Sequence, residues 1–254
     1  MLADLVAGEA ITVLLVFARL GAALMTVPGF GEQHVLPRLR LLVALAISML
    51  VSPALAGTMP ALPREPLALL ELLVPEILVG LLLGFVTRLA LTAIHVGGSL
   101  IALQSGLSAA AMFDPNEATQ GTIPGAFLAA AALTLLFAAD FHHLLLRAIA
   151  ASYSAFPVAS SIDPSAAGEL LTRLSGDALT AGARIAAPLV LAGVLVNLGL
   201  GAMGRMVPSF PIFFLALPVQ LLLALAMLEL TLPAAMSLFG ASFVRGVGWL
   251  GAAG

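Results

Sequence analysis

The residue types best suited to metal binding or catalysis are grouped in only one short segment of this sequence. The segment "ADFHHLLLR" contains Asp140, His142 and His143, which are residue types that bind metal ions. Adjacent residues on a helix point about 100° apart, so the two histidines cannot clasp one metal ion by themselves. No Cys occurs in the chain, and no further His or carboxylate pair has ligand spacing near this segment. The pattern therefore favours an interfacial pair of histidines, and we predict no metal site.

Two other patterns look reactive but lack the context that their chemistry needs. The segment "GLGAMG" at 199–204 has the spacing of a dinucleotide-binding loop, but it lies inside a charge-free apolar run and not between a strand and a helix. Glu71 and Glu76 are candidates for a proton relay, yet their five-residue spacing puts them on different sides of a helix, so structural pairing is expected. Nucleophile-elbow, P-loop and metalloprotease motifs are absent from the sequence. We predict neither a catalytic site nor a cofactor.

The composition is that of a membrane protein. Of 254 residues, 61% are hydrophobic and 9% are charged, with a mean hydropathy of +1.15, whereas soluble domains are about half apolar and a quarter charged. A net charge of −3 provides no electrostatic footprint for nucleic acid. Runs of roughly 18–20 apolar residues indicate membrane-spanning helices. Charge-free runs that approach or exceed this length are 89–113, 118–139, 185–204 and 206–228.

We therefore predict an all-α, multi-helix integral membrane protein built of helical hairpins with some broken helices, in one domain spanning residues 1–254. Residues 157–177 are expected to lie outside the membrane, where Asp163 caps a short helix that starts at Pro164 and stops at Gly176. Pro218 and Pro233 are candidate breaks in the last helix. The helices are expected near 8–27, 38–56, 66–96, 98–113, 124–151, 178–206 and 210–244.

Several charged residues interrupt the apolar runs. Arg19 lies in the middle of "AITVLLVFARLGAALMTV", and Glu71, Glu76 and Arg88 are spread through residues 66–96. A charge at the bilayer centre costs about 2.5–3.5 kcal/mol on insertion scales. These side chains must therefore face protein, water or headgroups, and the chain is expected to pack against other protein.

Two sets of residues recur every four positions and so share one helix face. Small residues at this spacing let helices approach closely in membranes, and Asn hydrogen-bonds across such interfaces. Either set is expected to pack within the chain or against a different subunit. The first glycine stripe is Glu76, Gly80, Gly84 and Arg88, and the second is Gly193, Asn197, Gly201 and Arg205.

The segment "GLSAAAMFDPNEATQGTIPG", residues 106–125, places polar and turn-forming residues between long apolar runs. Gly106, Pro115, Gly121 and Pro124 prevent one helix from running through it. Irregular backbone at membrane depth is tolerated only where it is buried in protein or lines a cavity. The alternative is an ordinary interhelical loop at the membrane surface.

Four segments in register resemble the FliR family of flagellar export-gate proteins, which is related to the SctT proteins of injectisomes. The likeness runs from about residue 15 to about residue 240, and its most specific parts are the loop at 106–115 and the positions Asn197, Leu198, Gly201, Arg205 and Pro208. The chain departs from the family pattern at Ser209, Phe210 and Pro211. The segments are "FARLGAALMTVPGFGEQHVLPRLRLLVALAISMLVSP", "GLSAAAMFDPNEATQG", "FHHLLLRAIAASYSAFP" and "VNLGLGAMGRMVPSFPIFFLALPVQL".

The resemblance implies a single copy of this protein among FliP and FliQ subunits, with FlhB alongside, in the flagellar basal body of the bacterial inner membrane. The complex would form the channel for unfolded export substrates, with the loop at 106–125 as a plug in its lumen. Met112 and Phe113 would supply the apolar seal, and Asp114, Asn116 and Glu117 would hold the loop or face water. The implied plug residues are Gly106, Met112, Phe113, Asp114, Pro115, Asn116 and Glu117. The candidate residues for helix packing or a subunit interface are those of the two glycine stripes together with Pro208.

Two other functions remain open at this point. An injectisome SctT homologue would have the same role, although "ARLGAALMTVPGFGEQHVLPRLR" favours the flagellar system. A stand-alone membrane transporter or channel would predict inverted repeats and broken helices that meet at a polar site in the middle of the membrane. No such symmetry is visible in the sequence.

Overall fold

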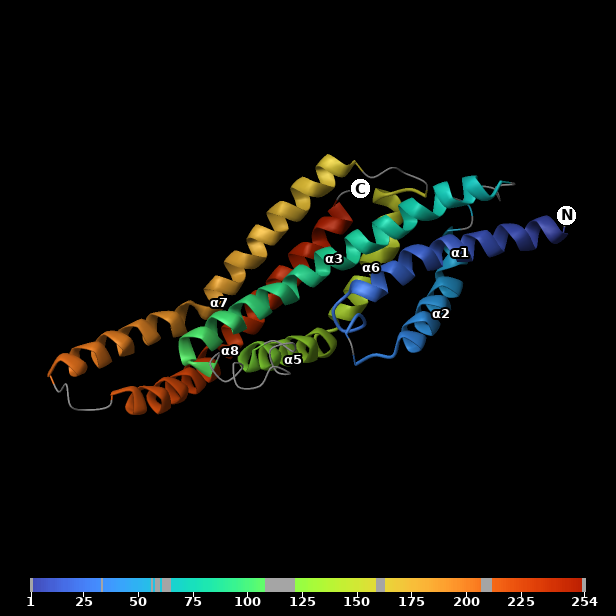
Figure 1. The fold of residues 1–254 in the computed structure, drawn as a ribbon. Coiled ribbons are helices and arrows are strands. Elements are labelled where there is room, and N and C mark those ends of the chain that lie inside the picture. Colours follow the sequence, from blue (N-terminus) through green and yellow to red (C-terminus); the bar gives the residue numbers. More distant parts are fainter. Residues whose placement is uncertain are drawn as a thin grey trace. The chain divides into compact units, whose positions relative to one another are not determined.

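Every regular element in the described part of the chain is a helix (Figure 1). The computed structural model describes residues 2–32, 34–55, 57, 60, 65–107, 122–158, 163–206 and 212–252, with the side chains of 2–7, 212–215 and 249–252 left out. The helices are α1 (Leu2–Thr26), α2 (Pro37–Leu55), α3 (Pro66–Ser105), α5 (Ile123–Ala138), α6 (Phe141–Ala155), α7 (Pro164–Met206) and α8 (Ile212–Ala252).

Most of these helices are candidate membrane spans by length and composition. Five of those in the described residues are long and apolar enough to cross a membrane, or six if α5 and α6 cross together as one broken span. The prediction of an all-α integral membrane protein is therefore confirmed.

The chain divides into two compact units. Unit 1 consists of Met1–Leu89, Ala139–Leu174 and Phe243–Gly254, and unit 2 of Ala90–Ala138 and Ser175–Ser242. Aliphatic and aromatic side chains fill both interiors. In unit 1 the Phe141 ring stacks on the Phe243 ring at 5.4 Å between centroids. The buried side chains of unit 1 include Leu15, Leu24, Leu83, Ile149 and Phe243, and those of unit 2 include Ile94, Ile101, Leu128, Leu136, Ile185 and Phe239.

Helix α3 corrects the predicted division into helices near 66–96 and 98–113. It is continuous for 40 residues and ends at Ser105, and residues 108–113 lie outside the described part. Gly97 and Gly98 serve close packing and not a break. A Cβ at Gly98 would overlap the backbone of Gly125 in α5, and a Cβ at Gly97 would lie 2.9 Å from Ile185 in α7.

The start of α7 is as predicted, but its end is not. Asp163 precedes Pro164, and its Oδ1 accepts hydrogen bonds from the Ser165 hydroxyl at 2.7 Å and backbone N–H at 2.9 Å. Both hydrogen bonds lower the pKa of the exposed Asp163 carboxyl, and the bond from the Ser165 hydroxyl has the larger effect. The predicted stop at Gly176 is wrong, because α7 runs on to Met206. An exposed glycine inside a helix costs only about 1 kcal/mol, which neighbouring residues offset.

The predicted single helix near 124–151 is two helices in the structure. Helix α5 ends at Ala138 and α6 begins at Phe141, because Asp140 between them has a left-handed backbone with a φ of 57°. The candidate breaks at Pro218 and Pro233 do not divide α8, which is continuous over 41 residues. Proline is tolerated inside membrane helices, where local adjustments satisfy the freed backbone groups.

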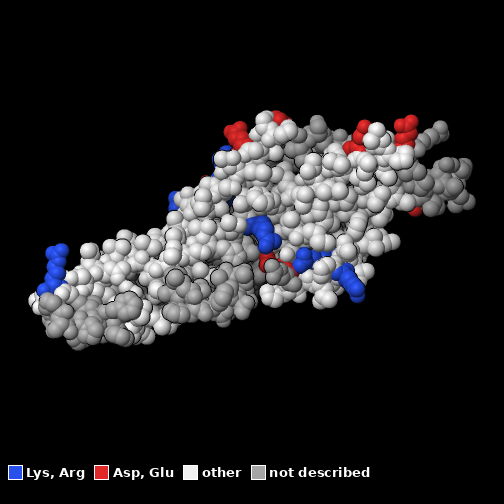
Figure 2. Space-filling view, in the orientation of Figure 1, with Lys and Arg blue, Asp and Glu red and all other residues white. Residues whose placement is uncertain are grey.

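The outer surface carries many large apolar side chains. Leu50 and Met206 are more than 80% exposed, and Leu195 and Leu230 at least 70%. Figure 2 shows one face on which charged side chains are confined to a few separate groups on an otherwise uncharged surface. Such surfaces are stable in contact with lipid or with partner proteins, but not with water.

Candidate functional site

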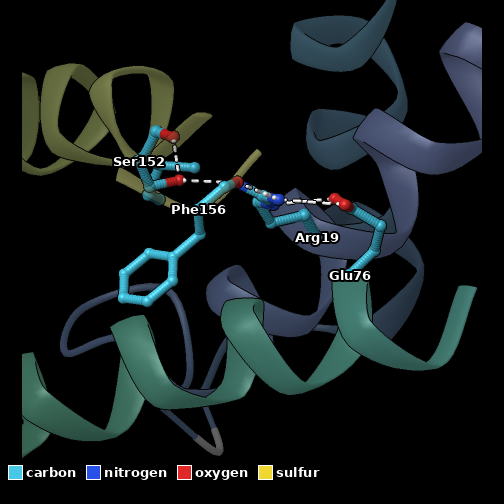
Figure 3. Close-up of polar contacts among 5 residues, drawn as sticks. Arg19, Glu76, Ser152 and Phe156 are labelled. Carbon is cyan, nitrogen blue, oxygen red and sulfur yellow. Dashed lines mark hydrogen bonds and ion pairs between the residues drawn. The ribbon is translucent and has the colours of Figure 1, made fainter. Parts of the chain in front are cut away.

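A buried ion pair forms the polar centre of unit 1. Arg19 of α1 and Glu76 of α3 are both fully buried, and their side chains meet in a two-pronged contact (Figure 3). Arg19 Nε donates to Glu76 Oε2 at 2.7 Å, and Arg19 Nη2 donates to Glu76 Oε1 at 2.9 Å. Because both carboxylate oxygens are engaged, Glu76 is placed for structural pairing and not for proton transfer.

The guanidinium of Arg19 also joins α6 to this centre. Its Nη1 donates to Ser152 Oγ at 3.1 Å, and its Nη2 donates to the carbonyl oxygen of Phe156 at 2.9 Å (Figure 3). The Tyr153 ring lies 3.8 Å from the guanidinium carbon. A buried charge is tolerable only when such partners replace its hydration. Arg19 therefore connects three helices through the four hydrogen bonds of one side chain.

The first glycine stripe continues along α3 from this ion pair and packs against α1 of the same chain. A Cβ at Gly80 would overlap the backbone carbonyl of Arg19, and one at Gly84 would lie 2.8 Å from the carbonyl of Ala23. At the end of the stripe, Arg88 Nη1 donates to the carbonyl of Thr26 at 3.2 Å. These contacts place all four stripe residues at an intrachain helix crossing.

The second glycine stripe, on α7, has two different halves. Gly193 is buried, and a Cβ there would overlap the Gln104 side chain of α3. Asn197 Oδ1 accepts a hydrogen bond of 2.7 Å from Gln220 Nε2 of α8. A Cβ at Gly201, by contrast, would meet no atom of the described residues within 4 Å, and Arg205 is exposed. Pro208 lies outside the described residues. Half of this stripe is therefore used within unit 2 and half faces away from the chain.

The segment singled out at 106–125 is described only at its ends. Helix α3 stops where Gly106 adopts a left-handed φ of 74°, and the chain re-enters a helix at Ile123, where Thr122 Oγ1 accepts from the Gly125 N–H at 3.3 Å. A cavity of about 340 Å³ opens beside Gly106 and is lined by Ser105, Leu107, Leu217, Pro218 and Leu221. The predicted plug residues Met112, Phe113, Asp114, Pro115, Asn116 and Glu117 lie outside the described part.

The break before α6 gathers the three residues noted for metal chemistry. Asp140 Oδ1 lies 3.3 Å from His143 Nδ1 and 3.8 Å from His142 Nε2. The two imidazole rings are 4.1 Å apart between centroids and tilted by 41°. One ligand atom from each residue falls within 4.8 Å of the other two. The structure thus brings the carboxylate of Asp140 close to both histidines, which the sequence could not show.

Sequence reasoning missed the partners of the polar residues that it found. Ser152, Tyr153 and Phe156 hold Arg19, and Gln104 and Gln220 meet the second glycine stripe. Ser152 is 133 residues from Arg19 in sequence, so no periodicity connects the two. The available signal was weaker: Gln104 and Gln220 are polar residues inside long apolar runs, where a buried or partnered position is expected.

Known proteins resemble this chain over most of its length. A family model described as bacterial export proteins, family 1, matches residues 10–246. The flagellar biosynthetic protein FliR of Caulobacter vibrioides is 36% identical over 218 residues, which cover 86% of this chain and 87% of that protein. FliR of Bacillus subtilis is 30% identical over 219 residues, with coverages of 85% and 83%. The Yop proteins translocation protein T of Yersinia pestis is 30% identical over 226 residues, with coverages of 87% and 85%.

Proposed function

The chain belongs to the FliR family of bacterial export proteins, a multi-pass membrane component of type III export apparatus, and we propose that it is a core subunit of the flagellar export gate. In this role it forms a channel in the bacterial inner membrane with FliP-like and FliQ-like subunits, with an FlhB-like protein alongside. Unfolded flagellar proteins pass through that channel. The energy for export comes from partners.

The observation that best supports a gate subunit is the exposed amide of Asn197, next to the outward half of the second glycine stripe. Asn197 is exposed on α7 beside Leu195 and Leu198, which are 70% and 66% exposed. The single hydrogen bond to Gln220 uses only part of the donors and acceptors of two amides. In lipid the remaining amide groups would lack partners, whereas a neighbouring subunit supplies them. This surface therefore fits a protein neighbour better than lipid.

The two described ends of the segment 106–125 support a gating loop. Gly106 turns the chain out of α3 beside an apolar cavity, and α5 starts only at Ile123. In the proposed role, Met112 and Phe113 seal the lumen against ions, and a flexible methionine yields to a passing chain. Asp114, Asn116 and Glu117 hold the loop by hydrogen bonds or face the water of the channel.

Removing the plug is expected to make the resting gate leak. We expect replacement of residues 110–117 by a Gly/Ser linker of equal length to leave the protein folded, because this segment lies between α3 and α5. Ion conductance across the membrane of cells that carry the variant complex should rise several-fold. A matched control replaces residues 57–64, in the connector between α2 and α3, with the same linker. Conductance equal to that of the wild type in the 110–117 variant would contradict the plug.

Leucine at Gly201 is expected to block assembly without harming the chain itself. Among the described residues, no atom lies within 4 Å of a Cβ at Gly201, and leucine is a much better helix former than glycine. Co-purification of the FliP-like partner with Gly201→Leu should fall several-fold. Gly176→Leu is the matched control, since Gly176 is an equally open position of the same helix. Normal recovery of the partner with Gly201→Leu would refute this interface.

The second candidate function is that of an injectisome SctT homologue, and the 30% identity to translocation protein T supports it. Expression of this chain in a flagellated bacterium that lacks its own FliR distinguishes the two. Restored swimming supports the flagellar role. Restored Yop secretion in a strain without its translocation protein T, together with failure to restore swimming, supports the other. A stand-alone transporter would instead be stable and monodisperse without any co-expressed FliP-like partner.

A further inference from the structure

We propose that Asp140, His142 and His143 form a binding site for a divalent transition-metal ion of the zinc type. The site lies at the break between α5 and α6 and is independent of the proposed gating loop. None of these three residues takes part in the contacts described for the two glycine stripes.

One distance in this cluster matches the edge of a metal coordination shell, and the other ligand atoms are only slightly farther apart. Zinc–nitrogen and zinc–oxygen bonds of about 2.0–2.2 Å in a tetrahedron place neighbouring ligand atoms roughly 3.3–3.6 Å apart. Asp140 Oδ1 lies 3.3 Å from His143 Nδ1 and 3.8 Å from His142 Nε2. The three ligand atoms all fall within 4.8 Å of one another. Small side-chain rotations bring them onto one ion.

Two features overcome the divergence of adjacent side chains on a helix. The histidines offer different ring nitrogens: His143 turns its near nitrogen, Nδ1, toward Asp140, and His142 turns its far nitrogen, Nε2. The longer reach of Nε2 compensates for the angular separation of their Cα–Cβ bonds. Asp140 itself sits just before the first turn of α6, so its carboxylate lies beside both rings rather than on the helix face of either one.

The backbone of Asp140 gives a second, independent reason to assign a role to this cluster. Its φ of 57° makes it a left-handed residue that is not glycine, a conformation that is uncommon outside glycine, although Asp and Asn adopt it more readily than other residues. Residues held in such conformations cluster at functional sites. Here the conformation is the one that places the carboxylate against the two imidazoles.

The ligand set defines the class of metal. Two neutral imidazoles and one carboxylate suit zinc, cobalt, nickel or copper, whereas magnesium and calcium prefer oxygen ligands. Three protein ligands leave one tetrahedral position for water or for a group from a partner. The side chains of Asp140 and His143 are 76% and 62% exposed, so an ion can enter. The exposed cation of Arg147, one turn after His143, weakens binding, and we expect micromolar affinity.

The test is a Co²⁺ titration of the full chain, purified in detergent with a tag that contains no histidine. Tetrahedral Co²⁺ bound to nitrogen has visible absorption bands that are much stronger than those of aqueous Co²⁺ and lie at longer wavelength. We expect saturable binding of one ion per chain, competition by Zn²⁺, and a rise in Tm with metal. Asp140→Asn, which tolerates the left-handed backbone, and His143→Ala should each lower the affinity at least tenfold and abolish the rise in Tm.

The control is His34→Ala, which removes an exposed histidine far from the cluster in sequence and should bind as the wild type does. Circular dichroism of each variant checks that the helices are intact. Absence of saturable binding, or equal affinities in the wild type, Asp140→Asn and His143→Ala, would overturn the site. None of these measurements depends on export, so a failure here leaves the proposed gate function untouched, and the reverse also holds.

Discussion

Replacing Glu76 with leucine is expected to lower the free energy of unfolding by about 3–5 kcal/mol, the cost of leaving a buried charge without its partner. Arg19 is fully buried and engages both oxygens of Glu76. Without the carboxylate, the partners left to the guanidinium within the described residues are the Ser152 hydroxyl, the Phe156 carbonyl and the Tyr153 ring, and none of these carries a compensating charge. Denaturant titration of the detergent-solubilised chain measures the loss.

The double variant Arg19→Met/Glu76→Leu separates loss of the pair from loss of packing. Replacing a whole buried ion pair by apolar residues of similar size is often neutral or stabilising. We therefore expect the double variant to recover most of the stability lost in Glu76→Leu. Glu71→Leu is the matched control, because Glu71 lies on the same helix but is exposed. A double variant as unstable as Glu76→Leu would mean that the charges are not the source of the effect.

The ion pair of Arg19 and Glu76 shows which features of the site the sequence could predict and which it could not. Hydropathy predicted that Arg19 and Glu76 must avoid lipid, because an unpaired charge there is costly. It could not predict that they meet, since 57 residues separate them and α1 packs on α3 only in the folded chain. The apolar sequence around a charged residue predicts that the charge needs a partner, whereas the tertiary structure determines which residue that partner is.

Helix boundaries show the same division between local and tertiary causes. The cap at Asp163 followed the sequence because an N-cap is a local hydrogen-bonding arrangement. The breaks predicted at Gly97 and Gly176 did not form, because glycine ends a helix only when nothing else favours continuing it. At Gly97 and Gly98 the packing of α5 and α7 onto α3 favours continuation. The break at Asp140 was missed, since Asp adopts a left-handed backbone far less readily than Gly.

Alanine at Gly80 is expected to destabilise the chain by about 1–2 kcal/mol or more, although the same substitution stabilises an ordinary helix. Alanine is favoured over glycine inside a helix by roughly 0.8–1 kcal/mol. At Gly80, however, the added methyl group would overlap the backbone carbonyl of Arg19 and lie 2.9 Å from Ala22 Cβ. A backbone cannot turn aside as a side chain does, so α1 and α3 must separate, and overpacking of this kind costs about 1–3 kcal/mol or more. Separation would also lengthen the hydrogen bonds between Arg19 and Glu76, one turn away.

The same substitution to alanine is expected to change the free energy of unfolding in opposite directions at two glycines. Gly176→Ala, at an exposed position with open space, should raise the free energy of unfolding, whereas Gly80→Ala should lower it. Gly80→Ala and Gly201→Leu differ in a second way. The first should reduce both the stability of the isolated chain and its recovery with a FliP-like partner, but the second only the recovery. Equal stabilisation by alanine at Gly80 and Gly176 would show that α1 and α3 do not approach at Gly80, and the first glycine stripe would then be available to another subunit.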